Sequence, residues 1–300
     1  MEKGQILRAL AAAAALVLIL VGTLSVFAEG QEETAMIGSS ESGGLWGGRT
    51  GEDEILSWNP EWMFADYSQI HESDVTLYRS DDPLGIVVAV NAGHGTAGGE
   101  NFKTLCHPDG SPKVTGGSTA EGAVYAISVS SGTTMLDGSA EAEHTLSLAL
   151  ILKDKLLERG FDVLMIRESA DVQLDNIART VFANQYADCH LSLHYDGSES
   201  DKGFFYIGVP DVASYRSMQP VASFWQQDEQ LGQCLVSGYR SVGGKIYGEG
   251  RVALDLTQTS YSTIPSLDVE VGDAASDCSY DTQSLIAEGI VKGVELYFGH

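Results

Sequence analysis

The fold of this chain is decided by the stretch LGIVVAVNAGHG, residues 84–95. Its first part is a continuous apolar run rich in β-branched side chains, which predicts a strand buried on both faces. Strands of that kind belong to mostly parallel sheets whose two faces are covered by helices. The run ends in Asn91 and then in His94, which lies between two glycines, so polar side chains follow where the strand is expected to end.

The sequence beyond this strand alternates between predicted helices and strands. Leucines at helical spacing predict an amphipathic helix over 143–159, which Gly160 ends. Further helices are predicted over 175–186, 220–242 and 281–298, and further strands over 161–167, 188–194, 203–208 and 264–271. This alternation predicts an α/β fold with three layers, in which helices cover both faces of a mostly parallel, twisted sheet.

Four side chains at the ends of these elements have the chemistry of a metal-dependent hydrolase. They are His94, Glu141, His194 and Glu270. The histidines and Glu270 fall at or near the carboxyl ends of predicted strands, where α/β sheets place their sites, and Glu141 begins the helix over 143–159. A zinc hydrolase needs three protein ligands, an open position for water and a nearby carboxylate. Three of the four could therefore hold a metal at the carboxyl ends of the strands, and the fourth could move a proton.

Three neighbouring residues compete for these roles. Glu143 follows Glu141 closely, and spacing alone does not separate the two. His190 shares the face of its strand with His194 but lies further back in the sheet, where a satisfied core histidine is the simpler interpretation. Asp268 lies on the same face of its strand as the candidate glutamate, and deeper in that strand.

The composition argues against some classes of function. The chain has 300 residues, a formal net charge of −25 and a pI near 4.4. Nucleic-acid binding draws its affinity from Lys and Arg, so no nucleic-acid partner is expected. The same charge opposes tight electrostatic binding to anionic lipids or anionic wall polymers. The hydrophobic fraction of 43% is sufficient for an ordinary core in one large domain with appendages.

The N-terminus has the features of a targeting segment. Lys3 and Arg8 precede an apolar run over 9–27. Residues 1–28 are therefore expected to form a signal peptide or a membrane anchor, which leaves the rest of the chain outside the cytoplasm. Residues 29–82, whose first part is rich in Glu, Gly and Ser, are expected to form a linker and an N-terminal extension.

The cysteines select no disulfide framework. Cys106, Cys189, Cys234 and Cys278 form no CxxC pair. Cys189 lies in an apolar run and is expected to be buried. A bridge such as Cys106–Cys278 is compatible with an oxidising compartment, but the spacing does not choose among the pairings.

Several separated motifs together resemble the catalytic domain of zinc-dependent N-acetylmuramoyl-L-alanine amidases of the amidase 3 family. In chain order they are Asn91–Gly95, Glu141 with its leucine-rich helix, Ser192–His194 and Pro265–Gly272. The similarity extends from about residue 84 to about residue 298. The resemblance therefore implies a catalytic domain over 83–300.

The resemblance implies a role for each candidate residue. His94, Glu141 and His194 match the zinc ligands, and Glu270, five residues after a proline, matches the catalytic glutamate. The interval to the glycine that ends the helix fits Glu141 and is two residues too short from Glu143. The family's cofactor is Zn²⁺, and its reaction is hydrolysis of the amide bond between N-acetylmuramic acid and L-alanine in peptidoglycan. An enzyme of this kind would act outside the cytoplasm, secreted or anchored to the outer face of the membrane.

The chain also departs from the family pattern. Residues 97–140 lie between the first two matched zinc ligands, where the family usually has a short loop, and are expected to form a lid-like segment or hairpin beside the metal. Tyr195-Asp196 and Asp273 also differ from many members, which affects the substrate groove more than the metal site. Arg179 matches a common arginine that we interpret as structural. No wall-binding repeat is recognisable, so membrane anchoring would depend on the N-terminal apolar segment.

Two alternative functions use the same residues. A catalytically silent, secreted protein that binds peptidoglycan or regulates its turnover could keep the fold, because a fold does not fix a function. A zinc peptidase acting on the stem peptides would use the same metal chemistry. Only the identity of the product separates that peptidase from an amidase.

Overall fold

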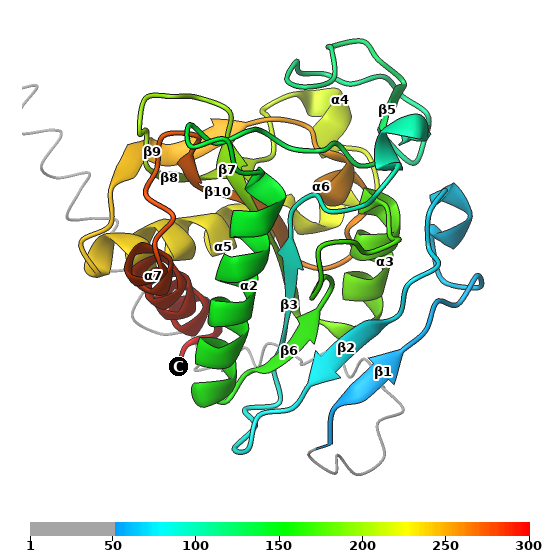
Figure 1. Cartoon of the computed structure of the whole chain (residues 1–300). Coiled ribbons are helices and arrows are strands. Elements are labelled where there is room, and N and C mark those ends of the chain that lie inside the picture. The colour runs from blue at the N-terminus through cyan, green and yellow to red at the C-terminus, as the bar shows by residue number, and fades with distance from the viewer. Residues whose placement is uncertain (1–51) are drawn as a thin grey trace, which may run out of the picture. The chain divides into compact units, whose positions relative to one another are not determined.

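The computed structural model describes residues 52–300, which form an α/β domain around an eight-stranded sheet (Figure 1). The order of the strands across the sheet is β1-β2-β6-β3-β7-β10-β8-β9. The bounds of these strands are β1 (Glu54–Leu56), β2 (Val75–Tyr78), β3 (Val87–Ala92), β6 (Asp162–Met165), β7 (Cys189–Asp196), β8 (Phe204–Gly208), β9 (Ile246–Ala253) and β10 (Ser266–Asp273).

The middle of the sheet is parallel. Strands β6, β3, β7 and β10 pair in parallel, and β9 pairs in parallel with β8 at one edge. Strands β1 and β2 add to the other edge in antiparallel orientation, and β8 runs antiparallel to β10. The predicted α/β class with a mostly parallel sheet is confirmed. Strands β1 and β2 come from the stretch that the sequence assigned to a linker and extension.

Helices cover both faces of the sheet, as predicted (Figure 1). On one face lie α2 (Glu141–Glu158), α5 (Val221–Ser241) and α7 (Tyr280–Phe298). On the other face lie α3 (Asn176–Tyr186) and the short α6 (Thr257–Tyr261). The short helix α4 (Ala213–Arg216) precedes α5, and a 3-10 turn, η1 (Ala65–Tyr67), lies between β1 and β2.

Strand β3 shows how the sequence produces these layers. Val88 and Val90 belong to the core formed with α2 and α7, whereas Ala89 belongs to the core formed with α3. All three side chains are completely buried. The strand is therefore apolar at every position up to Asn91, because neither of its faces meets water.

Helices α5 and α7 approach each other through glycines. A Cβ on Gly238 of α5 would lie 2.3 Å from the backbone nitrogen of Gly293 in α7. That separation is far below a van der Waals contact, so any side chain at this position would force the helices apart.

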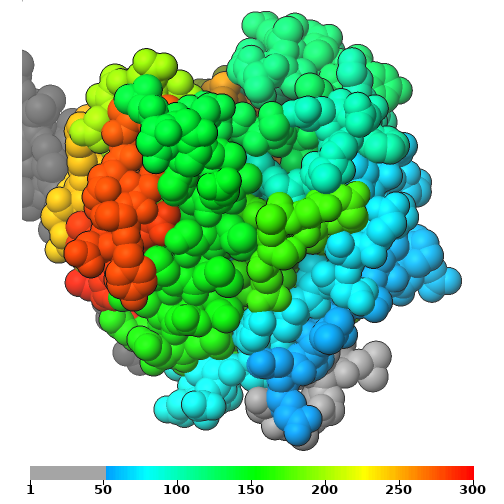
Figure 2. Space-filling model, in the orientation of Figure 1, coloured from blue at the N-terminus to red at the C-terminus, as the bar shows by residue number. Residues whose placement is uncertain are grey.

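Residues 97–140, called the inserted segment below, lie over the carboxyl edge of the parallel strands (Figure 1). They contain the 3-10 turn η2 (Gly99–Asn101) and an antiparallel pair formed by β4 (Lys103–Leu105) and β5 (Tyr125–Ile127). In Figure 2 they form much of the teal and green lobe at the upper right. The segment is thus separate from the main sheet but rests on the edge where the predicted site lies.

Two further expectations concern the cysteines and the membrane. All four cysteines are free thiols, so the pairing Cys106–Cys278 is not formed, and Cys189 is completely buried as expected. Within residues 52–300, no helix has the length and apolar character needed to cross a membrane. The predicted signal peptide or anchor over 1–28 lies outside the described residues.

Candidate metal centre and active site

His94 lies in the turn that follows β3. Its backbone has a φ of 64°, a left-handed conformation that is uncommon for a residue with a Cβ. A Cβ on the preceding Gly93 would lie 2.3 Å from Cε1 of His194, so this position has no room for a side chain. Nδ1 of His94 lies 2.8 Å from the carbonyl oxygen of Ser130, which can only accept. Nδ1 therefore donates to this carbonyl, and Nε2 is the nitrogen that faces Glu141 and is free to bind a metal once it carries no proton.

Two buried arginines hold this turn in place. Arg179 donates hydrogen bonds to the carbonyl oxygens of Ala92 (3.0 Å) and His94 (2.6 Å). Arg167 donates to those of Ala92 (3.1 Å) and Gly93 (3.0 Å). Burial lowers the pKa of Arg179 to about 9 and that of Arg167 to about 10, so both remain cations at neutral pH. Arg179 thus has a structural role, because it fixes the backbone that carries His94.

Glu141 is the first residue of α2 and is buried. Its Oε1 lies 2.9 Å from Nε2 of His94 and 3.1 Å from Nδ1 of His194. Its Oε2 accepts a hydrogen bond of 2.8 Å from the backbone N–H of Thr133. Burial alone would raise the pKa of this carboxyl, but the two histidines hold it well below its ordinary value. Glu143 is exposed, so the structure brings Glu141 and not Glu143 to the histidines.

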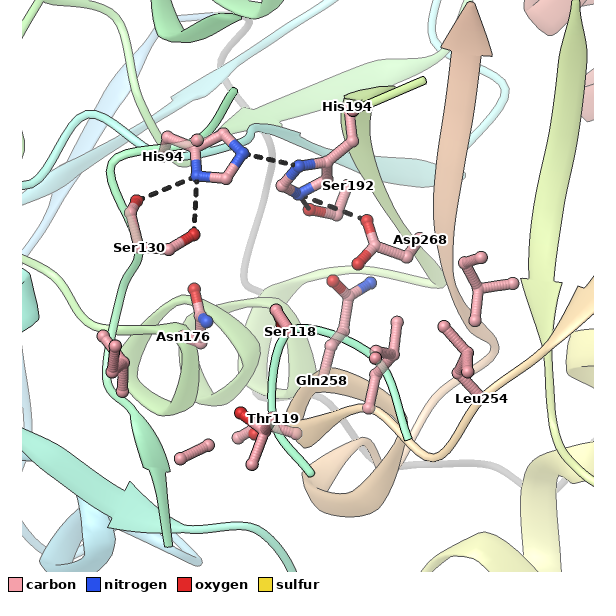
Figure 3. Close-up of a pocket in the computed structure, with 18 of the residues that line it drawn as sticks. His94, Ser118, Thr119, Ser130, Asn176, Ser192, His194, Leu254, Gln258 and Asp268 are labelled. Atoms are coloured by element: carbon pink, nitrogen blue, oxygen red, sulfur yellow. Dashed lines mark hydrogen bonds and ion pairs between the residues drawn. The ribbon is translucent and has the colours of Figure 1, made fainter. Parts of the chain in front are cut away.

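His194 lies near the carboxyl end of β7. Its Nδ1 lies 3.0 Å from Nε2 of His94, while its Nε2 lies 3.2 Å from Oγ of Ser192 and 3.2 Å from Oδ1 of Asp268 (Figure 3). Burial would lower the pKa of His194, but the carboxylates of Asp268 and Glu141 raise it to about 10. A raised pKa favours the form of His194 that carries protons on both ring nitrogens. A metal ion that binds Nδ1 would have to displace the proton on that nitrogen.

The competing histidine, His190, lies elsewhere. It is completely buried in β7, and its Nδ1 lies 3.3 Å from Oγ of Ser266. Burial lowers the pKa of His190 to about 3, which keeps it neutral. This is the core histidine that the sequence favoured.

The ligand atoms of His94, Glu141 and His194 converge on one point. They lie within 4.8 Å of one another and form the one group of metal-binding side chains with this spacing found among residues 52–300. The separations between the facing atoms are 2.9, 3.0 and 3.1 Å. Tetrahedral ligands at roughly 2.0–2.1 Å from zinc lie about 3.3 Å apart, close to these separations. Two imidazoles and one carboxylate are also a donor set of zinc hydrolases, so the residues fit this metal.

Glu270 lies beside this cluster. Strand β10 pairs with β7 so that Glu270 is level with His194, and Asp268 is level with Ser192. Oε2 of Glu270 is buried and has no hydrogen-bond partner among the described residues. Burial raises the pKa of Glu270 well above its ordinary value, and the carboxylates of Asp268 and Glu141 add to this effect. A carboxyl group in this setting is suited to accept and release a proton.

These side chains line a cavity of about 610 Å³. Figure 3 shows His94, His194 and Asp268 on one side, and a loop of the inserted segment with Ser118 and Thr119 on the other. Much of the remaining lining is small or neutral and polar: Gly116, Gly117, Ser130, Thr133, Asn176, Thr257 and Gln258. Hydroxyl and amide groups of this kind suit a ligand rich in amides and hydroxyls.

Asp255, which follows β9, fastens the inserted segment to the domain. Its carboxylate accepts hydrogen bonds from Nε2 of His107 (3.0 Å), Nζ of Lys113 (2.9 Å) and the backbone N–H groups of Val114 (2.6 Å) and Thr115 (3.1 Å). The hydroxyl of Thr115 donates to the same carboxylate. Burial would raise the pKa of Asp255, but these donors hold it well below its ordinary value. The residues that follow Thr115 form the cavity wall, so Asp255 sets the position of that wall.

Two of these acids had no role in the sequence prediction. Asp268 was placed on the same strand face as Glu270, but its contact with His194 depends on the register between β10 and β7, which neither strand reveals alone. No local sequence pattern pointed to the role of Asp255, because its partner Thr115 is 140 positions away in the chain.

Comparison with known proteins agrees with the resemblance found in the sequence. The family model Amidase_3, described as N-acetylmuramoyl-L-alanine amidase, matches residues 88–295 and confirms that resemblance. A comparison with curated proteins gave no match.

Several solved structures share the fold. The apo form of the N-acetylmuramyl-L-alanine amidase Ami1 from Mycobacterium abscessus has a TM-score of 0.57 and 21% identity, covering 71% of this chain and 99% of that one. Ami1 from Mycobacterium smegmatis has a TM-score of 0.55 and 20% identity, covering 73% and 99%. The amidase AmiC2 of Nostoc punctiforme has a TM-score of 0.52 and 16% identity, covering 73% and 99%. At these identities the likeness establishes the fold.

Proposed function

Because the chain belongs to the Amidase_3 family of N-acetylmuramoyl-L-alanine amidases and is therefore an amidase, we propose that it uses zinc to cleave the bond between N-acetylmuramic acid and L-alanine in peptidoglycan. His94, Glu141 and His194 are the proposed ligands, and Glu270 is the proposed catalytic residue. The observation that carries this proposal is the convergence of three ligand atoms beside the unpartnered Oε2 of Glu270.

Hydrogen bonds and charges within the protein set the orientation of His94 and the ionisation of Glu141 without a metal. Zinc, when bound, would supply an activated water and polarise the amide carbonyl. Nε2 of His94 is directed at the cluster because the Nδ1–H of the same ring donates to the carbonyl of Ser130. Glu141 stays ionised because the two histidines lower its pKa. The site therefore offers two neutral nitrogens and one anionic oxygen once His194 releases a proton.

Glu270 is placed to move the proton that hydrolysis requires. It would take a proton from the attacking water and deliver it to the nitrogen of the leaving L-alanine. Its raised pKa helps both steps, because burial makes the carboxylate a stronger base than an exposed glutamate and lets it hold the accepted proton until the leaving nitrogen takes it. Its unpartnered Oε2 leaves an acceptor free for the water.

The substrate and the location follow from the same reasoning. The hydroxyl and amide groups that line part of the cavity suit the amides and hydroxyls of a muramyl peptide, and apolar side chains such as Ile207 and Leu254 line another part. We assign the catalytic residues and their cavity to 83–300, to whose sheet β1 and β2 add one edge, and the inserted segment forms one wall of the cavity. The N-terminal apolar run over 9–27 would export the chain or anchor it to the outer face of the membrane, where the cell wall lies.

The test uses the full-length chain and purified peptidoglycan. New N-terminal amines are labelled and identified, with and without a zinc chelator and with zinc added back. We expect L-alanine termini that disappear with the chelator and return with zinc. Termini of other stem residues would instead identify a zinc peptidase, and the absence of any new terminus from a zinc-loaded chain would support a silent binder.

Three glutamine substitutions separate the roles of the acids. Glu270→Gln should keep the metal and lower kcat by about 10²- to 10⁴-fold, since it removes the proton acceptor alone. Glu141→Gln should lose metal and activity together. Glu143→Gln is the matched control, because Glu143 lies on the same first turn of α2 but is exposed. Equal behaviour of the Glu141 and Glu143 variants would contradict the proposed ligand set.

A further inference from the structure

We propose that Asp268 is a positioning residue that fixes the orientation and tautomer of His194 and thereby strengthens metal binding. This inference rests on the proposed function, since it takes His194 as a metal ligand. Asp268 itself is outside the metal cluster and lies two residues before Glu270 on β10.

The two ring nitrogens of His194 face different groups. Nδ1 lies towards the metal position, 3.0 Å from Nε2 of His94 and 3.1 Å from Oε1 of Glu141. Nε2 faces Oδ1 of Asp268 and Oγ of Ser192, each at 3.2 Å (Figure 3). Only Nδ1 is placed to bind the metal, so a productive His194 must carry its proton on Nε2.

Ser192 alone does not select this tautomer, because a hydroxyl can donate or accept. Its Oγ already accepts a hydrogen bond of 3.2 Å from Nδ2 of Asn91, which leaves its own hydrogen available to Nε2 of His194. In that arrangement the ring proton would reside on Nδ1 and block the metal. A carboxylate can only accept, so Asp268 favours the N–H on Nε2 and the free lone pair on Nδ1.

The surroundings of Asp268 support this role. Its neighbours on β10, Leu267 and Val269, are completely buried and face the core. Oδ1 of Asp268 is itself buried and has no hydrogen-bond partner within the described part of the chain. A carboxylate oxygen left in that state destabilises a fold. A protonated Nε2 of His194, 3.2 Å away, is the group that would offset this penalty.

The experiment measures zinc affinity, which does not depend on turnover. Full-length wild type, Asp268→Asn and Asp196→Asn are stripped of metal and titrated with zinc in competition with a chromophoric chelator. Asparagine has the shape of aspartate but presents a donor as well as an acceptor, so it no longer enforces the tautomer. Asp196 lines the same cavity, but its partner is Lys202 at 2.6 Å, so its substitution controls for a general loss of negative charge.

We expect Asp268→Asn to weaken zinc binding about 10- to 100-fold, the range for outer-shell partners of metal histidines. Asp196→Asn should change it less than 3-fold, and Asp268→Glu should recover part of the affinity. The visible bands of the cobalt-substituted protein should shift in Asp268→Asn alone, since only there does the ligand reorient.

The outcomes distinguish this inference from the proposed function. If wild type binds zinc and Asp268→Asn binds it equally well, the positioning role is refuted and the metal site stands. An equal loss in Asp196→Asn also refutes it, because the effect would then be one of overall charge. If wild type binds no zinc, the proposed metal site and this inference are both overturned. Thermal unfolding of the metal-free proteins serves as the folding control, and a variant that unfolds early is replaced by Asp268→Glu.

Discussion

The substitution Asp255→Asn tests whether one buried carboxylate holds the inserted segment in place. Asp255 is 1% exposed, and its partner Lys113 is 7% exposed. Removing the charge leaves the Lys113 ammonium buried without its anion. The other hydrogen-bond donors around position 255 keep one acceptor, the amide oxygen of the new asparagine. Breaking a buried pair from one side costs about 3–5 kcal/mol. We take the lower end, about 3 kcal/mol, because Lys113 can turn towards solvent once it is released.

The assay combines stability with local exposure. Urea unfolding should show the loss of about 3 kcal/mol, which is a large share of the roughly 5–15 kcal/mol that stabilises a typical domain. Limited proteolysis should cut the Asp255→Asn variant within 107–119, where wild type resists. The KM for peptidoglycan should rise, since the cavity wall bearing Ser118 and Thr119 loses its support.

The matched control is Asp211→Asn. Asp211 also forms an ion pair, with Arg216 at 2.7 Å, but its side chain is 90% exposed. Exposed pairs contribute little, so this variant should match wild type in both assays. If Asp255→Asn differs from Asp211→Asn by less than about 1 kcal/mol and its segment stays resistant to protease, the reasoning about this anchor is wrong.

Three further predictions follow from pH and from close contacts. The folded state lowers the pKa of Asp255, so the contribution of its carboxylate to stability is complete above the ordinary Asp pKa near 4 and is lost as the pH falls below that value. The difference in unfolding free energy between wild type and Asp255→Asn, measured by urea titration, should therefore shrink below about pH 4. Gly132→Ala should weaken zinc binding, since its Cβ would lie 2.7 Å from Cδ2 of His94, whereas Gly138→Ala, with a similar positive φ and no atom within 4 Å, should change stability slightly and leave zinc affinity unchanged. Gly238→Ala should lower the free energy of unfolding by about 1–3 kcal/mol, as expected for overpacking between α5 and α7, and circular dichroism in urea would measure this.

Much of the fold could be predicted because its signals are local. The apolar run before Asn91 required burial on both faces, and β3 has that burial. The four longer helices follow the spacing of their apolar residues, and their bounds differ from the prediction by two residues at most. Strand β9 was missed, since Ile246–Ala253 includes two glycines and a glutamate and has only one buried residue, Gly250. Its place in the sheet comes from pairing with β8, which no local pattern encodes.

Part of the candidate site could likewise be predicted from the sequence, and part could not. His94 follows β3, and His194 and Glu270 lie in the carboxyl-terminal halves of β7 and β10, so the carboxyl edge of a parallel sheet brings them together. The position on the helix did not separate Glu141 from Glu143, because both lie on the first turn of α2; only the family resemblance, through the interval to Gly160, favoured Glu141. The structure distinguishes them by direction, since one points to the histidines and the other to solvent.

The anchoring of the inserted segment has an evolutionary consequence. Thr115 and Asp255 are 140 positions apart, yet each satisfies hydrogen bonds of the other. In a relative with only a short loop here, an aspartate at position 255 would lack these hydrogen-bond donors, and its buried carboxylate would destabilise the fold. The two stretches should therefore be gained or lost as a pair across related sequences. Grafting the segment onto a short-looped relative should succeed only if the aspartate is transplanted with it.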